Sequence, residues 1–215
     1  MASRRPGVAD ILYVMASELE YGPELRARIS PLITGIGPIE AANAVTERLT
    51  RLEIEDKLPL MVVSLGSAGS DGLEQCGLYQ ASIVSWRDMD ASALGFEKGV
   101  VPFSDIPAKI SLGPFVPGLP MATLSTGSNI VSGSAYDDID AEMVDMETYA
   151  VLRACQRYGL PLIALRGISD GDRELGSVGD WTQYLSIIDV KLGEAVDRLE
   201  AAIAGGTLDW AEPSD

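Results

Sequence analysis

The stretch Leu160-Pro-Leu-Ile-Ala-Leu-Arg-Gly-Ile-Ser-Asp170 starts as an apolar run and ends in two polar residues. A short apolar run bounded by turn-forming residues is typical of a strand that is buried on both faces. A helical pattern from Val144 to about Tyr158 precedes it, and Gly159 and Pro161 end that helix. This part of the chain therefore predicts a helix followed by a buried strand.

The same alternation of strand and helix patterns continues outward along the chain. We expect further strands at residues 11–16, 60–65, 80–85 and 121–124, and helices at residues 39–52 and 181–204. This order indicates a three-layer α/β fold, with a central mixed, mostly parallel twisted sheet flanked by helices. No repeat or linker interrupts the pattern, so we expect one domain over residues 1–215, with flexible tails at residues 1–9 and 206–215.

The composition limits the classes of function. The chain is 47% hydrophobic and 22% charged, which is ordinary for a soluble globular protein, and its net charge of −16 argues against nucleic-acid partners. Cys76 and Cys155 have no recognisable metal or redox spacing, so we expect no metal, no cofactor and a cytoplasmic location. No apolar run is long enough to cross a bilayer, so no membrane partner is expected.

The chain has no histidine among its 215 residues. Acid–base chemistry must therefore fall to carboxylates, or less readily to Lys, Tyr or Cys, and a Ser-His-Asp triad is excluded. Glu147 stands near a predicted helix start and Asp170 just beyond a buried strand. Two such carboxylates can converge on one crevice, because ligands of open α/β sheets lie at the carboxyl ends of the strands.

Structural explanations remain open for each of these residues. Glu147 is also placed to stabilise a helix N-terminus, and Asp170 to form a turn with its glycine neighbour. Arg166 lies in an apolar strand and needs a partner, so an Arg–Asp cluster could be purely structural. By themselves, Glu20 would be a solvated helix start and Trp181 a core residue.

Two glycine-rich segments are also candidates. Gly66-Ser-Ala-Gly69 follows a buried strand and fits a ligand loop and a plain strand-to-helix turn equally well. Gly35-Ile-Gly37 favours a tight turn before a helix, because a dinucleotide fingerprint needs a third glycine where this chain has Glu40.

Together these segments resemble the purine nucleosidase and phosphorylase superfamily, and above all bacterial 5′-methylthioadenosine/S-adenosylhomocysteine nucleosidases. Six motifs of the family occur in the family's order between Ile11 and Leu185. They match Ala16-Ser-Glu-Leu-Glu20, Gly35 to Gly37, Gly66 to Gly69, Asp88-Met-Asp-Ala-Ser-Ala-Leu-Gly95, Met146-Glu147 and Arg166 to Asp170.

The resemblance implies a nucleoside phosphorylase-like fold and a role for each residue. Asp170 would protonate N7 of a leaving adenine, Glu20 would activate the attacking water, and Glu147 would hold the ribose hydroxyls. The other implied contacts are Met146 on the sugar, Ser169 and Arg166 on Asp170, backbone groups of Ile130 and Val131 on the base, Trp181 over the base, and Ser67 in the pocket. Ser17 replaces a methionine of the family in the pocket wall. In a homodimer, the partner subunit would close the 5′ side with Ala91, Leu94 and Pro102.

The implied reaction is hydrolysis of the N-glycosidic bond of an adenine nucleoside, a task for one acid and one base. An ordinary Asp, with a pKa of roughly 3.9, is a poor acid near neutrality, so burial or a hydrogen bond must raise the pKa of Asp170.

Two alternatives to hydrolysis remain. Phosphorolysis is disfavoured because Ser64 stands where phosphorylases of the superfamily carry an arginine. A purine-binding protein without catalysis is motivated by the short segments at 20–35 and 103–121, where relatives usually carry a hairpin and a helix.

Overall fold

The computed structural model describes residues 11–171 and 178–210. Within them, the strands are β1 (Ile11–Met15), β2 (Leu32–Ile33), β3 (Met61–Gly69), β4 (Leu78–Trp86), β5 (Lys109–Ser111), β6 (Met121–Thr126), β7 (Met143–Asp145) and β8 (Leu162–Asp170). The helices are α1 (Pro23–Arg26), α2 (Pro38–Ile54), α3 (Thr148–Gln156), α4 (Val178–Thr182) and α5 (Leu185–Gly205), with the 3-10 turns η1 (Ser92–Leu94) and η2 (Gly133–Asp138).

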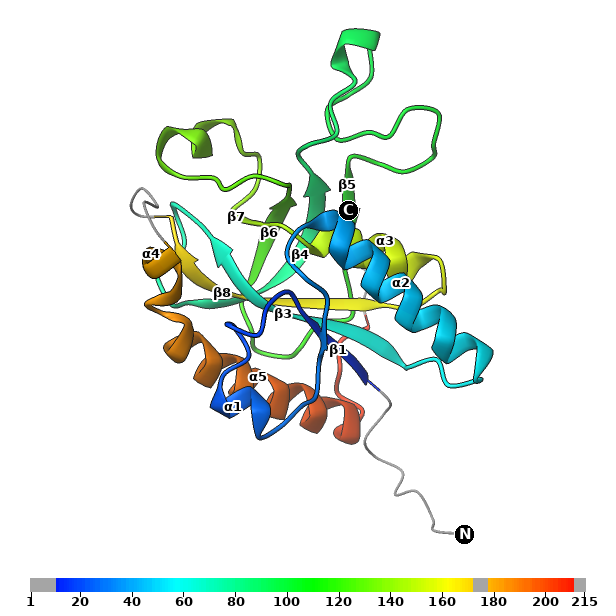
Figure 1. Cartoon of the computed structure of the whole chain (residues 1–215), viewed down its shortest axis with the longest axis vertical. Helices are drawn as coiled ribbons and strands as arrows, with labels where there is room; N and C mark the ends of the chain where they lie inside the picture. The colour runs from blue at the N-terminus through cyan, green and yellow to red at the C-terminus, as the bar shows by residue number, and fades with distance from the viewer. Residues whose placement is uncertain (1–10, 172–177, 211–215) are drawn as a thin grey trace.

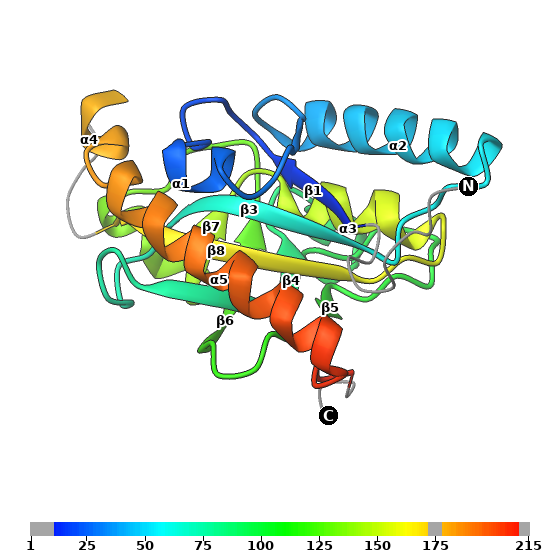
Figure 2. The ribbon, with the colours of Figure 1, turned by 90° about the horizontal axis from the view of Figure 1, so that it is seen from below.

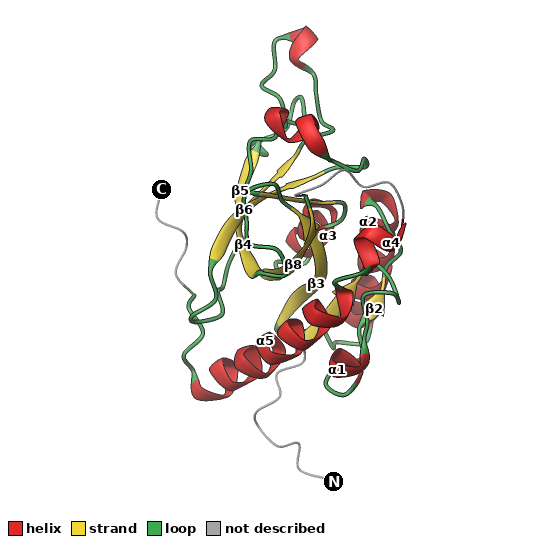
Figure 3. Ribbon diagram, turned by 90° about the vertical axis from the view of Figure 1, so that its left-hand side faces the viewer, coloured by secondary structure: helices red, strands yellow, loops and turns green. Residues whose placement is uncertain are grey.

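The strands form one mixed sheet, in the order β2-β1-β3-β7-β6-β4-β5. β8 pairs with both β3 and β4, so the strands β3, β7, β6, β4 and β8 form a closed ring. Figure 3 shows the resulting curvature of the sheet. Most pairs are parallel, including β1–β3 and β3–β8, whereas β4 runs antiparallel to β5 and β8, as β7 does to β3. The expected mixed, mostly parallel sheet is therefore confirmed.

Helices cover both faces of the sheet, and the alternation of side chains along each strand explains why (Figures 1 and 2). In β8, Leu162 and Ala164 pack in the core beneath α2 and α3, whereas Ile163 and Leu165 pack in the core beneath α1 and α5. Burying each leucine or isoleucine contributes about 1.5–3 kcal/mol, so the run Leu162–Leu165, which is apolar at every position, stabilises both layers. The three-layer arrangement is as expected.

The element boundaries differ from expectation where tertiary pairing overrides the local pattern. β3 continues through Gly66 to Gly69, so this segment is part of a strand and not a turn before a helix. α3 begins at Thr148 because the residues before it pair as β7 with β3 and β6. α2 begins at Pro38, one residue before the predicted start, and proline suits the first helical position.

The C-terminal part holds two further corrections. The single helix expected at 181–204 is two helices, α4 and α5, separated at residues 183–184. Residues 206–210 are not a free tail: Leu208 is buried against the core beneath α5, and the backbone of Asp209 pairs with that of Phe115. In residues 11–171 and 178–210, no helix combines the length and the apolar character needed to cross a membrane.

Candidate active site

Glu20 follows β1 and is buried, with 7% of its surface exposed. Its Oε1 accepts hydrogen bonds from the backbone N–H of Ser67 at 2.7 Å and from the Ser67 hydroxyl at 2.6 Å. A Cβ on Gly66 would lie only 3.2 Å from the same oxygen, so the glycine allows this close approach. The interpretation of Glu20 as a solvated helix start is therefore wrong.

Trp181, in α4, is connected to Glu20 through Ser67. Its indole Nε1 donates to the Ser67 hydroxyl at 2.9 Å, and that hydroxyl donates onward to Glu20. Since Ser67 Oγ accepts from the indole, its own proton is free to point at the carboxylate. The indole thus fixes the Ser67 hydroxyl and, through it, one oxygen of Glu20.

A bulge at the end of β8 sets the direction of Asp170. Ala68 pairs with Ile168, but the next residue, Gly69, pairs with Asp170, so Ser169 is the extra residue. Bulges of this kind commonly redirect a side chain next to an active site. The Ser169 hydroxyl donates to Asp170 Oδ2 at 2.6 Å, which is the expected contact between these two residues.

The ionisation of Asp170 is shifted in the direction that an acid catalyst needs. Burial raises the pKa of this carboxyl above its ordinary value, and the hydrogen bond from Ser169 opposes the shift. Of the two causes that the sequence analysis named, burial or a hydrogen bond, burial acts here in the expected direction.

Arg166 does not bind Asp170, contrary to the expectation that it positions that residue. Its guanidinium binds the Asp145 carboxylate at 3.0 and 3.2 Å and donates to the hydroxyls of Thr148 and Ser64. The alternation of β8 explains this, because Arg166 points to the α2 and α3 face, where α3 begins. Burial raises the pKa of both Glu20 and Glu147, and the positive charge of Arg166 opposes that rise.

Glu147 is the residue before α3, but its side chain does not cap that helix. Asp145 does so, since it accepts from the backbone N–H and the hydroxyl of Thr148. Glu147 Oε1 instead accepts from the backbone N–H of Gly37 at 2.8 Å. Burial, together with the negative charge of Asp145, raises the pKa of Glu147 to about 7.

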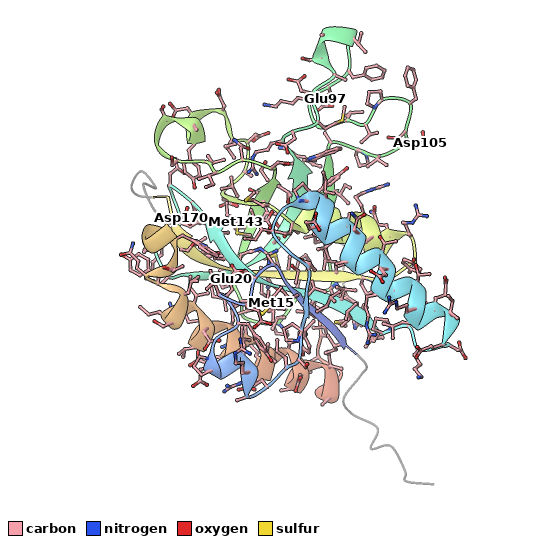
Figure 4. The ribbon with its side chains drawn as sticks, viewed as in Figure 1. Met15, Glu20, Glu97, Asp105, Met143 and Asp170 are labelled. Carbon is pink, nitrogen blue, oxygen red and sulfur yellow. The ribbon has the colours of Figure 1, made fainter. Side chains whose placement is uncertain are left out.

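A small cavity joins these segments. Glu20, Glu147 and Arg166 line it, together with Val14, Met15, Ala16, Thr34, Ser64, Leu65, Gly66, Ser67 and Val151. Asp170 does not line this cavity, but its Oδ1 is 2.7 Å from the point where a Cβ of Gly69 would lie. The side chain of Glu20 thus lies beside Gly66, and that of Asp170 beside Gly69. Both residues are in the same part of the molecule (Figure 4).

The remaining expected residues fall into two groups. Met146 and Ser17 are half-buried near the cavity-lining segments, Val131 is buried, and Ile130 is 68% exposed. The three residues expected to face a partner, Ala91, Leu94 and Pro102, lie between β4 and β5, on a segment that stands away from the sheet (Figures 1 and 4).

Sequence reasoning missed two side chains beside the carboxylates. Asp145, three residues before Thr148, caps α3 and also neutralises the charge of Arg166. Tyr136, in η2, gave no signal in the sequence, yet its buried hydroxyl lies against Gly69 and next to Asp170.

Comparisons with known proteins bear on the resemblance that the sequence motifs indicated. A family model described as the phosphorylase superfamily matches residues 123–198, which include Glu147 and Asp170. The resemblance to the nucleosidase and phosphorylase superfamily is thereby confirmed.

The chain is also similar in sequence to 5′-methylthioadenosine/S-adenosylhomocysteine nucleosidases. That of Exiguobacterium is 28% identical, with 80% of this chain and 81% of the relative covered. That of Staphylococcus saprophyticus is 26% identical, with 77% and 78% covered.

Solved structures share the fold. The nucleosidase of this name from Colwellia psychrerythraea, in complex with adenine, has a TM-score of 0.75 at 20% identity and covers 92% of this chain and 97% of its own. A futalosine hydrolase mutant of Helicobacter pylori has a TM-score of 0.74 at 19% identity and covers 89% and 98%. The nucleoside phosphorylase-like fold expected from the sequence is confirmed.

Proposed function

We propose that this protein hydrolyses the N-glycosidic bond of an adenine nucleoside of the 5′-methylthioadenosine, S-adenosylhomocysteine or 5′-deoxyadenosine type. The observation that carries the proposal is the pair of carboxylates, the buried Glu20 and the half-buried Asp170, beside the two ends of the segment 66–69. The names of the similar nucleosidases support the substrate class.

In this mechanism the reaction uses one acid and one base. Asp170 in its protonated form gives its proton to N7 of adenine, and the bond between N9 and C1′ breaks as the base takes the electron pair. Glu20 accepts a proton from the water whose oxygen bonds to C1′. The products are adenine and a ribose derivative, and the two carboxyl groups exchange their protonation states.

Glu147 serves as the ribose clamp in this proposal. An ionised carboxylate only accepts hydrogen bonds, which suits the neighbouring 2′- and 3′-hydroxyls of the sugar. Its Oε1 already binds the Gly37 N–H, so one edge of the carboxylate is fixed and the other remains for the ligand. Trp181 over the base and the backbone groups of Ile130 and Val131 complete the proposed contacts.

The ligation of Arg166 favours water over phosphate as the nucleophile. Arg166 is the only Lys or Arg among the residues that line the described cavity. Its donors are already used by Asp145, Thr148, Leu165 and two oxygen atoms of Ser64. No pair of its N–H donors is free to bind an anion, and phosphate binding would need such a pair.

We also propose a cytoplasmic homodimer. Leu94 and Phe103 are 77% and 98% exposed on the segment between β4 and β5. Large apolar side chains at such exposure favour contact with another protein surface. In the dimer, Ala91, Leu94 and Pro102 would close the 5′ side of the partner's site.

One assay tests the function. Adenine release is measured with a panel of 5′-substituted adenosines, with and without added phosphate. Release that is independent of phosphate supports hydrolysis, and a strict need for phosphate would establish phosphorolysis. Binding of adenine with no release from any nucleoside would establish a binding protein instead.

A further inference from the structure

The hydroxyl of Tyr136 is buried and has no hydrogen-bond partner within the described residues. The residue is 6% exposed, and its ring packs against Val131, Ile139 and Val144. An unsatisfied buried hydroxyl costs about 1–3 kcal/mol, and a bound ligand that hydrogen-bonds it would remove that cost.

The hydroxyl lies next to the proposed acid. A Cβ built on Gly69 would lie 2.4 Å from Tyr136 Oη and 2.7 Å from Asp170 Oδ1. Only a residue without a side chain lets the two groups come so close to the same point of β3. Ser169 already occupies Asp170 Oδ2, which leaves Oδ1, the oxygen on the Tyr136 side, for a ligand.

The chemistry of a purine identifies the group that would meet this hydroxyl. If Asp170 faces N7, as the proposed function requires, the neighbours of N7 along that edge are C8–H on one side and the 6-substituent on the other. C8–H cannot satisfy a hydroxyl. A 6-amino group can donate to it, and a 6-oxo group can accept from it.

We propose that Tyr136 is a specificity-determining residue whose hydroxyl hydrogen-bonds the 6-substituent of the purine held by Asp170. This inference rests on the proposed function. Because a hydroxyl both donates and accepts, Tyr136 favours 6-amino and 6-oxo purines over a purine without a polar 6-substituent.

The test compares the affinities of free bases for the wild type and for one variant, so it does not depend on catalysis. Calorimetry measures adenine, hypoxanthine and unsubstituted purine on the wild type and on Tyr136→Phe. The variant keeps the ring in its apolar cluster, so its melting temperature should equal or exceed that of the wild type without ligand. Tyr158→Phe is the matched control, since its hydroxyl binds Thr50 on the far side of the molecule, in α2.

We expect Tyr136→Phe to weaken adenine about tenfold and to leave unsubstituted purine nearly unchanged, while Tyr158→Phe changes neither. An unchanged ratio of adenine to purine affinity in Tyr136→Phe, or no binding of adenine to the wild type, would overturn the inference. The two proposals can fail separately. If Tyr136→Phe weakens adenine as expected but the wild type cleaves no nucleoside, only the hydrolase proposal is refuted. If the wild type cleaves nucleosides but the ratio of adenine to purine affinity is unchanged in Tyr136→Phe, only the role of Tyr136 is refuted.

Discussion

Arg166 and Asp145 form a buried ion pair with 3.0 Å between Nη2 and Oδ2, and the side chains are 3% and 2% exposed. The pair connects β8, which ends at Asp170, to the end of β7, two residues before Glu147. It therefore fixes the position of one site element relative to the other.

Asp145→Asn should destabilise the fold by about 3–5 kcal/mol, because it leaves the Arg166 charge buried without its counter-ion. Urea unfolding at pH 7 measures the change. Asp197→Asn is the control, since Asp197 pairs with Arg28 at the surface and its loss should change stability little. Equal effects of the two substitutions would contradict the importance of the buried pair.

Asp170→Asn should abolish turnover and leave the fold intact. Loss of a general acid lowers rates by roughly 10²–10⁴-fold, whereas the amide preserves the shape of the side chain. Adenine release and thermal melting are measured together, with Asp71→Asn, an exposed neighbour in sequence, as the control. Near-normal activity in the Asp170 variant would remove this residue from the mechanism.

Glu20→Gln should lower kcat by roughly 10²–10⁴-fold and leave KM and adenine affinity nearly unchanged. The amide oxygen can still accept the two bonds from Ser67, but the side chain can no longer take a proton from water. Steady-state kinetics measure kcat and KM, and titration with adenine measures the affinity. A large rise in KM with normal kcat would assign Glu20 to binding.

Ser67→Ala should move the acidic limb of the pH profile of kcat/KM to higher pH. The hydrogen bonds from Ser67 lower the pKa of Glu20, against the larger effect of burial, which raises it. Without the hydroxyl the pKa of Glu20 rises, and the ionised base forms only at higher pH. Trp181→Phe, which removes the donor to Ser67, should act in the same direction or leave the limb in place. A shift to lower pH in either variant would argue against this connection.

Nucleoside affinity should rise as the pH increases through about 7, the pKa of Glu147. Below it the carboxyl is protonated and cannot accept from both ribose hydroxyls. Adenosine binding to Asp170→Asn, which does not turn over, measures the effect. 2′,3′-Dideoxyadenosine is the control and should lack this pH dependence. The same dependence for both ligands would exclude Glu147 as the clamp.

The same shift affects stability. The folded protein holds the Glu147 proton more tightly than the unfolded chain, so this contribution is complete below about pH 4.5 and is lost as the pH rises through about 7. Glu147→Gln should therefore be stabilised relative to wild type more at pH 8 than at pH 5. Urea unfolding at both values checks the sign.

Much of the fold was predictable because the local signals agreed with the tertiary outcome. The apolar run before Asp170 had to be a strand buried on both faces, and Pro38 marked the start of α2. The closure of the sheet through β8, the continuation of β3 to Gly69 and the short strand β7 were not predictable, because each depends on pairing between segments distant in sequence.

For the site, the sequence by itself determined the kind of chemistry: without histidine, acid–base work falls to carboxylates, or less readily to Lys, Tyr or Cys. The family motifs indicated Glu20, Glu147 and Asp170. Only the tertiary structure decided which groups surround them. It paired Arg166 with Asp145, because the alternation of side chains along β8 turns Arg166 toward α3. It also brought Tyr136 to Asp170 across Gly69. Such contacts are set by register and burial, which a local pattern of residue types does not contain.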